Sequence, residues 1–232
     1  MSQWEAPNKP AELTESRLVE AILNGTFAIN SSLPPERELA EQLGVTRPTL
    51  REALQRLSRD GWIEIHHGKP TRVRDYWREG NLTILGTIAR FPQYLPADFV
   101  TNLLNIRLLL APQYTRLAVQ YNRDQVLGYL AGQSSLKDNA EDFTRFDMNF
   151  HVLCTQLSNN PVFTLIFNGF GDLYQATGLI YFSQPASRAS SLKYYQVLTD
   201  AVKTNDLDRV ETIVRNVMQE SIQLWHKANA SK

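Results

Sequence analysis

The sequence predicts a mainly α-helical protein with a small β wing: an N-terminal winged helix-turn-helix followed by a C-terminal all-α antiparallel helical bundle. Three observations lead to this fold class. Apolar residues recur at helical spacing over most of the 232 residues. A spacing of two occurs only in residues 62 to 73. Residues 44 to 74 hold seven Lys and Arg against three acidic residues, which leaves 17 basic and 21 acidic residues elsewhere and indicates two domains with different partners.

Three short helices are expected first, each followed by a glycine. Residues 12 to 24 carry one apolar stripe. Residues 33 to 44, "LPPERELAEQLG", begin with prolines, which favour a helix start, and close at Gly44. Residues 47 to 60, "RPTLREALQRLSRD", have Pro48 in their first turn. Because only two residues separate the second and third helices, the pair has the form of a helix-turn-helix.

A β hairpin is expected next, in "WIEIHHGKPTRVR", residues 62 to 74. Its side chains alternate between two faces and the chain turns at Gly68, which is typical of a wing. Residues 75 to 81, "DYWREGN", are expected to connect the wing to the rest of the chain.

The remainder is expected to be helical throughout, with breaks at prolines, asparagines and aspartates. The expected helices are 82 to 91, 96 to 121, 123 to 137, 139 to 158, 160 to 183, 186 to 204 and 207 to 228. We therefore expect a winged-helix DNA-binding domain at 1–76, a linker at 77–84 and a helical domain at 85–232 that binds the effector and contributes to dimerisation.

Composition excludes several classes of protein. No apolar run is long enough for a membrane span, and the first residues lack the layout of a secretory signal, so we expect a cytoplasmic protein with no membrane partner. The single cysteine, Cys154, excludes an internal disulfide framework and is expected to be a buried packing thiol. The sequence has no nucleophile elbow, catalytic Cys/His pair or phosphate loop, so an enzyme is not expected.

Arginines at the start of the third helix suggest DNA recognition. Arg47 and Arg51 are four residues apart and therefore point the same way, where an arginine fork in the major groove can bond both O6 and N7 of guanine. Arg37, at the start of the second helix, can reach a phosphate or a base edge. The wing tip suits a minor groove or the DNA backbone and consists of His67, Gly68 and Lys69. The alternative is a set of solvated surface arginines, such as Arg37 paired with Glu41.

An aromatic stripe marks the second domain. Phe163, Phe167, Phe170 and Tyr174 recur at steps of four, three and four. Three glycines are interleaved with them, and each costs about 1 kcal/mol in a helix relative to alanine. One reason to keep them is space for a ligand, and helices of a bundle can supply an apolar tunnel. The residues alone do not separate this interpretation from an ordinary hydrophobic core.

The segment "LPPERELAEQLGVTRPTLREALQRLSRDGWIEIHHGKPTRV" resembles the winged-helix domain of the GntR family of bacterial regulators. More narrowly, "NLLNIRLLL", "LIFNGFGDLYQATGLIYF" and "ESIQLWHK" resemble the members of this family that respond to acyl-CoA and control fatty-acid metabolism. The resemblance implies a homodimer on palindromic operator DNA, with contacts from Arg37, Arg47, Arg51 and Gly68, and with Thr46, Thr49, His67 and Lys69 nearby.

The resemblance also implies an effector, long-chain acyl-CoA, and no cofactor. Binding would release the operator, so that the protein represses fatty-acid degradation genes and activates unsaturated fatty-acid synthesis genes. The indole of Trp225 would stack on adenine, and Arg107 or Lys227 would meet phosphates. The full set of expected ligand-binding residues is Arg107, Asp147, Phe167, Tyr174, Tyr181, Glu220, Ser221, Trp225 and Lys227.

A metal-dependent regulator that senses a small organic acid is the rival interpretation. Many relatives hold a metal through an Asp-x3-His pair and two later histidines, and "DMNFH" supplies Asp147 and His151. At the positions matching the later histidines this chain has Tyr195 and a residue around Met218. We therefore expect no metal, and a buried polar pair or ligand contacts at Asp147 and His151.

Overall fold

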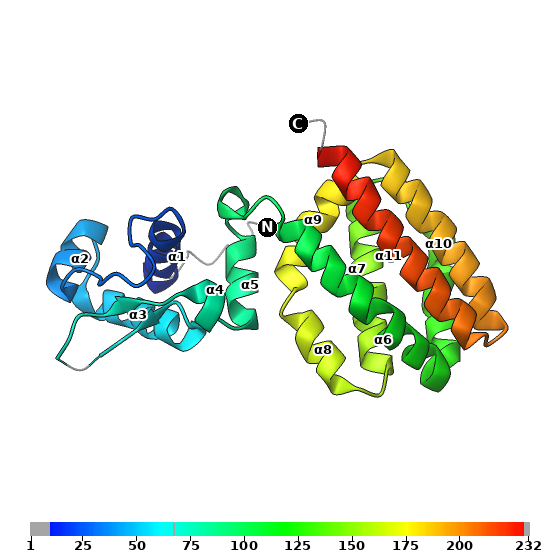
Figure 1. Ribbon diagram of the computed structural model, residues 1–232, viewed down its shortest axis with the longest axis horizontal. Coiled ribbons are helices and arrows are strands. Elements are labelled where there is room, and N and C mark those ends of the chain that lie inside the picture. The colour runs from blue at the N-terminus through cyan, green and yellow to red at the C-terminus, as the bar shows by residue number, and fades with distance from the viewer. Residues whose placement is uncertain (1–9, 67, 230–232) are drawn as a thin grey trace, which may run out of the picture. The chain divides into compact units, whose positions relative to one another are not determined.

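A computed structural model describes residues 10–66 and 68–229 of the chain. It divides into two compact units, residues 1–94 and 95–232. Helices dominate both, and a two-stranded sheet lies in the first (Figure 1). The predicted fold class is confirmed. The described part of the chain has no helix that is both long and apolar enough to cross a lipid bilayer.

The first unit begins with α1 (Pro10–Leu23), α2 (Glu36–Leu43) and α3 (Arg47–Asp60). Gly44 ends α2 with φ 66°, a left-handed conformation that glycine adopts without strain. Thr46 caps α3: its hydroxyl accepts a hydrogen bond from the Thr49 backbone N–H at 3.3 Å. The packing of α1 on α3 buries Leu18 and Leu50 completely.

The wing consists of β1 (Ile63–Glu64) and β2 (Arg72–Val73), paired antiparallel. The chain then forms α4 (Tyr76–Glu79), α5 (Leu82–Ala89) and η1 (Pro92–Tyr94). Part of the expected connecting segment is thus helical, because the backbone carbonyl of Asp75 accepts from the N–H groups of Arg78 and Glu79. The ring of Tyr76 packs on buried Trp62, with 4.9 Å between centroids. The expected domain boundaries stay a prediction.

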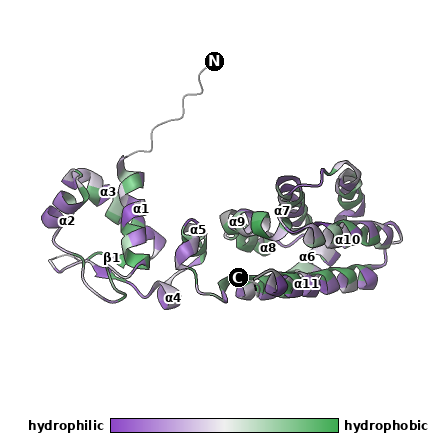
Figure 2. Ribbon diagram, turned by 90° about the horizontal axis from the view of Figure 1, so that it is seen from above, coloured by the Kyte–Doolittle hydropathy of each residue, from purple (hydrophilic) through white to green (hydrophobic). Residues whose placement is uncertain are grey.

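In its described residues, the second unit is a bundle of seven helical elements. They are α6 (Phe99–Leu130), η2 (Ala131–Ser135), α7 (Ala140–Leu157), α8 (Pro161–Asn168), α9 (Gly171–Phe182), α10 (Pro185–Lys203) and α11 (Leu207–Asn229). In Figure 1, α11 runs beside α10 and packs on α6, while α7 packs on α6 and α9. Figure 2 shows hydrophobic and hydrophilic residues interspersed along α11, as expected of a helix with one buried face.

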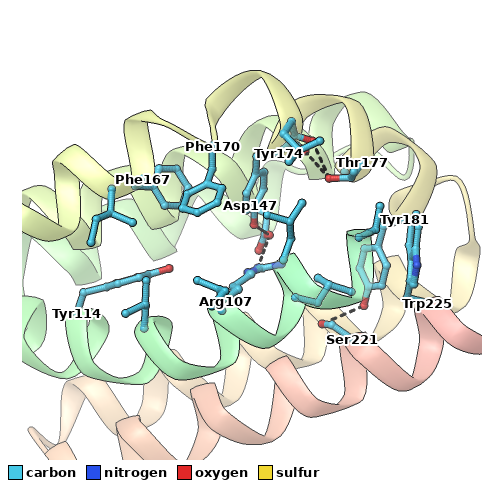
Figure 3. A pocket seen from close by; sticks show the side chains of 18 of the residues that line it. Arg107, Tyr114, Asp147, Phe167, Phe170, Tyr174, Thr177, Tyr181, Ser221 and Trp225 are labelled. Carbon is cyan, nitrogen blue, oxygen red and sulfur yellow. Dashed lines mark hydrogen bonds and ion pairs between the residues drawn. The ribbon is translucent and has the colours of Figure 1, made fainter. Parts of the chain in front are cut away.

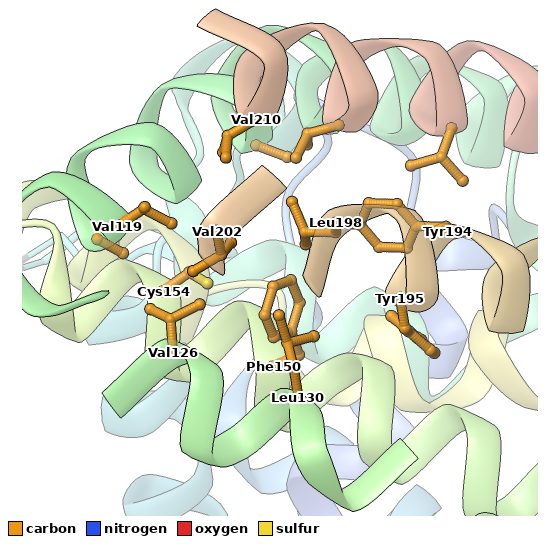
Figure 4. Packing of buried hydrophobic residues seen from close by; sticks show 14 of the residues in the cluster. Val119, Val126, Leu130, Phe150, Cys154, Tyr194, Tyr195, Leu198, Val202 and Val210 are labelled. Atoms are coloured by element: carbon orange, nitrogen blue, oxygen red, sulfur yellow. The ribbon is translucent and has the colours of Figure 1, made fainter. Parts of the chain in front are cut away.

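A hydrophobic core fills the bundle (Figure 4). Phe150, Leu198 and Val202 meet there, each completely buried. Cys154 is buried among them, as expected from its apolar helical setting, and burial raises the pKa of its thiol. Met218 is 2% exposed and belongs to this core.

Two boundaries in this unit depart from the sequence-based expectation. The break expected at Asn122 is a kink within α6, where Asn122 has φ −142° and ψ 43° and its side-chain amide donates to the Leu157 carbonyl at 2.9 Å. The prediction of a single helix over 160 to 183 is wrong. Gly169 and Phe170 separate α8 from α9, because their N–H groups bond the carbonyls three residues back and tighten the last turn.

Candidate functional site

The end of α3 presents arginines to solvent. Arg47, at its first residue, and Arg51, one turn later, are both exposed, as is Arg37 on α2. Within the described residues, neither Arg37 nor Arg47 forms an ion pair. Thr46 directly precedes Arg47, the hydroxyls of Thr46 and Thr49 are 2.9 Å apart, and both residues take part in capping the helix. Arg37 and Arg47 therefore give this surface positive charge that no described carboxylate pairs with, whereas Arg51 is paired with Glu36 at 2.8 Å.

Other basic residues of the same region are neutralised. Arg56 donates to Glu52 at 2.7 Å, Arg59 to Asp60 at 3.0 Å and Arg72 to Glu64 at 3.0 Å. The excess of positive charge found in the sequence is therefore available to a partner mainly through the unpaired side chains. Arg56 and Glu52 have the i, i+4 spacing of a helix pair, whereas Arg72 and Glu64 meet only through the pairing of β1 and β2.

The wing carries a further cation. Gly68 has φ 69° and is exposed, and Lys69 beside it is exposed as well. A residue with this backbone conformation and no side chain permits close approach to a polyanion. His67, the remaining member of the expected wing tip, lies outside the described residues.

A mostly apolar pocket lies within the helical unit (Figure 3), with a cavity volume of about 90 Å³. Its walls come from α6, α7, α8, α9 and α11. All four members of the aromatic stripe line it, although Phe163 and Phe167 lie on α8, Tyr174 lies on α9 and Phe170 lies between the two helices. Seven of the nine expected ligand-binding residues also line it: Arg107, Asp147, Phe167, Tyr174, Tyr181, Ser221 and Trp225.

A buried ion pair lies in the wall of this pocket. Arg107 donates through Nη2 to Asp147 Oδ2 at 2.8 Å, and the hydroxyl of Tyr174 donates to the same oxygen. The hydroxyl of Tyr195 donates to Oδ1 at 2.7 Å. Burial opposes ionisation of Asp147, but the Arg107 charge and the tyrosine hydroxyls outweigh burial and hold its pKa below the usual value. Arg107 also lies over the Tyr174 ring, 5.0 Å from its centroid.

His151 completes this cluster. Its Nε2 lies 2.6 Å from Nη2 of Arg107 and must accept, since a guanidinium has no acceptor. Its Nδ1 therefore carries the proton and donates to the Tyr114 hydroxyl at 2.7 Å. Burial and the Arg107 charge lower the pKa of His151 to about 3, so the imidazole is neutral.

The last helix contributes the other end of the pocket. Ser221 donates to the Val217 carbonyl at 2.8 Å and accepts from the Tyr181 hydroxyl at 3.2 Å. Figure 3 shows Trp225 one turn beyond Ser221, beside Tyr181. The two expected residues that do not line the pocket, Glu220 and Lys227, lie exposed on the same helix.

Two family profiles match adjacent parts of the chain. The profile of bacterial regulatory proteins of the gntR family matches residues 10–73, and that of the FadR C-terminal domain matches residues 74–231. The chain is a GntR-family regulator with a FadR C-terminal domain. This result confirms the resemblance noted in the sequence.

Individual relatives agree with this assignment. A "Fatty acid metabolism regulator protein" of Yersinia pestis (strain Pestoides F) is 40% identical over 217 residues, which cover 94% of this chain and 91% of that protein. A protein of the same name from Yersinia pseudotuberculosis serotype O:1b has the same identity and coverage. A solved structure titled "Lar controls the expression of the Listeria monocytogenes agr system and mediates virulence" has a TM-score of 0.66 at 15% identity, covers 95% of this chain and 98% of that one, and supports the fold.

Sequence reasoning missed part of the pocket in this GntR-family regulator. Val100, Leu103, Leu104 and Leu110 of α6 line it together with Arg107. Their signal was present, because these positions repeat at steps of three and four around Arg107 in "VTNLLNIRLLL", residues 100 to 110, and mark one helix face.

The Asp-x3-His pair of the regulator contacts an arginine. The same nitrogen of Arg107 bonds both Asp147 and His151, and Tyr195 bonds Asp147 as well. Among the described residues, no group of three His, Cys, Asp or Glu side chains is placed to hold a metal ion. His226 is exposed on α11, and Met218 lies in the core.

Proposed function

We propose that this GntR-family regulator controls genes of fatty-acid metabolism in the cytoplasm, repressing degradation genes and activating genes of unsaturated fatty-acid synthesis. It would bind a palindromic operator as a homodimer and leave the operator when long-chain acyl-CoA binds. Residues 1–76 would bind DNA, residues 77–84 would form the linker and residues 85–232 would bind the effector. The observation that carries the proposal is the apolar, aromatic pocket of the FadR C-terminal domain, in a chain 40% identical to proteins named as fatty acid metabolism regulators.

The DNA contacts would come from the exposed end of α3 and from the wing. Exposed Arg47 and Arg51 are suited to base edges, and Arg37 to a phosphate or base. The capping bond between Thr46 and Thr49 would hold the backbone of this end in place. The wing would contribute His67, Gly68 and Lys69.

The acyl-CoA would enter the pocket of the helical unit. Its apolar lining suits a fatty tail, with Phe167 and Tyr174 on the walls. Ligand pockets usually measure about 300–1,000 Å³, so the cavity of about 90 Å³ must widen to take a long chain. Binding would therefore move side chains that line the pocket.

The polar part of the ligand would lie at the α11 end. Tyr181, Ser221 and Trp225 line that end, and exposed Glu220 and Lys227 lie on the same helix. Asp147 already compensates the charge of Arg107, so Arg107 is better suited to an uncharged oxygen of the ligand than to its phosphates.

A calorimetric titration with oleoyl-CoA, with and without operator DNA, tests this function. We expect binding near one ligand per chain, weakened by DNA about 5- to 150-fold, because the two ligands must affect each other by the same factor. Free coenzyme A is the control for the contribution of the fatty tail. Equal affinity with and without a bound operator would contradict the coupling, and an absence of binding would contradict the effector.

A further inference from the structure

An ion pair links the two helices of the helix-turn-helix at the DNA-facing arginines. Nε of Arg51 donates to Oε2 of Glu36 at 2.8 Å, across 15 residues of sequence. Glu36 is the first residue of α2, and Arg51 lies one turn into α3. The arginine side chain is 59% exposed and that of the glutamate 37%. Both therefore lie at the surface where DNA is proposed to bind.

The Arg51–Glu36 ion pair contributes little to the stability of the fold. Ion pairs between exposed side chains are screened by water and contribute little to folding. A carboxylate beside the proposed interface also repels phosphates, which works against binding. The geometry of the contact between Glu36 and Arg51 indicates an effect of Glu36 other than stability.

The contact involves the edge of the guanidinium nearest the helix. It occupies Nε, while the two terminal nitrogens of Arg51 make no hydrogen bond or ion pair with any other described residue. These two nitrogens form the fork that bonds O6 and N7 of guanine. A guanidinium is rigid and planar, so a bond at Nε limits the directions in which the fork can point.

We propose that Glu36 is a positioning residue that determines base specificity: it holds the Arg51 fork toward guanine. The inference rests on the proposed function, because it requires α3 to lie in the major groove. Glu36 itself need not touch DNA. Because the Arg51 side chain already has few orientations before binding, it loses less conformational entropy when it bonds guanine. The contact with guanine is therefore more favourable, which increases the preference for guanine over the other bases.

A purely structural role predicts something different. An acidic residue in the first turn of α2 stabilises that helix through its dipole, and Glu38 lies in the same turn. If this were the whole role of Glu36, its loss would lower the melting temperature without changing the preferred DNA sequence. Glu38 is exposed and accepts from Gln42 of its own helix at 3.3 Å, so it provides a matched control.

The experiment selects binding sites from a random DNA duplex library with the full-length protein and then measures affinities for the selected site and its single-base variants. The variants are Glu36→Ala, Glu36→Gln, Arg51→Ala and Glu38→Ala. Glutamine keeps an acceptor for Arg51 Nε and removes the charge. Thermal melts of all variants report the structural contribution separately.

We expect Arg51→Ala to lose a guanine preference of about 5- to 150-fold at one position in each half-site. Glu36→Ala should weaken the preference at the same position by about 2- to 5-fold, the range that an exposed ion pair can supply. Glu36→Gln and Glu38→Ala should keep it.

Three results would overturn the inference while leaving the proposed function in place. They are an unchanged preference in Glu36→Ala, a loss at a position that Arg51→Ala does not affect, and an equal loss in Glu38→Ala. A wild-type protein that selects no sequence would instead reject DNA recognition itself, and with it the role of Glu36.

Discussion

Because His151 is buried and neutral, the helical unit should become less stable at mildly acidic pH. Nε2 of His151 accepts from Arg107 at 2.6 Å, and this contact is possible only while the imidazole is neutral. The pKa of His151 is lowered to about 3 by burial first and by the Arg107 charge second. In an unfolded chain the same group has a pKa of about 6.5.

The sign follows from which state binds more protons. Below about pH 6.5 the unfolded chain protonates its histidine while the folded one does not, so stability is present above this pH and falls as the pH drops toward 3. The slope approaches about 1.4 kcal/mol per pH unit. Between about pH 7.5 and 5 the expected loss is therefore about 2 kcal/mol in the free energy of unfolding.

Urea unfolding followed by far-UV circular dichroism measures this loss, with the transition of the helical unit fitted by itself. The matched control is His151→Gln, whose amide oxygen can accept from Arg107 but does not titrate. We expect the pH dependence of the wild type to exceed that of His151→Gln by about 2 kcal/mol over this interval. Equal pH dependence in the two proteins would refute the neutral, buried histidine.

Three other substitutions test further parts of the structure. Asp147→Asn should cost about 3–5 kcal/mol of stability in urea unfolding, because it leaves the Arg107 charge buried without its partner; a cost below about 1 kcal/mol would contradict this. Gly178→Ala would place a Cβ 2.8 Å from Cγ2 of Thr144, so the melting temperature of this variant should fall. Adding Thr144→Ala to the same protein should restore the melting temperature. A Gly178→Ala variant as stable as the wild type would contradict this close packing. Lys69→Ala should reduce the slope of log affinity against log salt by about one unit on any DNA duplex, and an unaltered slope would remove the wing from the contacts.

Local features of this protein were predictable because they depend on residues close in sequence. The glycine after α2, the proline in the first turn of α3 and the turn at Gly68 all appear where the pattern placed them. The long helix expected over 160 to 183 was the exception. Its apolar stripe continues through Gly169, and periodicity does not show that the hydrogen bonds there tighten and end α8.

The pocket was only partly predictable. Phe167 and Tyr174 were singled out because aromatic residues recur there at helical spacing, although the two lie on different helices, and an ordinary core has the same pattern. Whether that face lines a cavity depends on what the opposite helix contributes, here the stripe around Arg107 on α6. Those two segments are far apart in sequence and meet only in the folded bundle.

The charge pattern, the helix caps and the order of elements follow from the amino-acid sequence, because each arises within a few neighbouring residues or from composition. Which charges find partners was decided by packing. Arg107 reaches Asp147 across 40 residues of sequence, and Arg51 reaches Glu36 across 15. Such pairs form when separate helices bring their side chains within hydrogen-bond distance, and helical spacing within one segment carries no information about its neighbour.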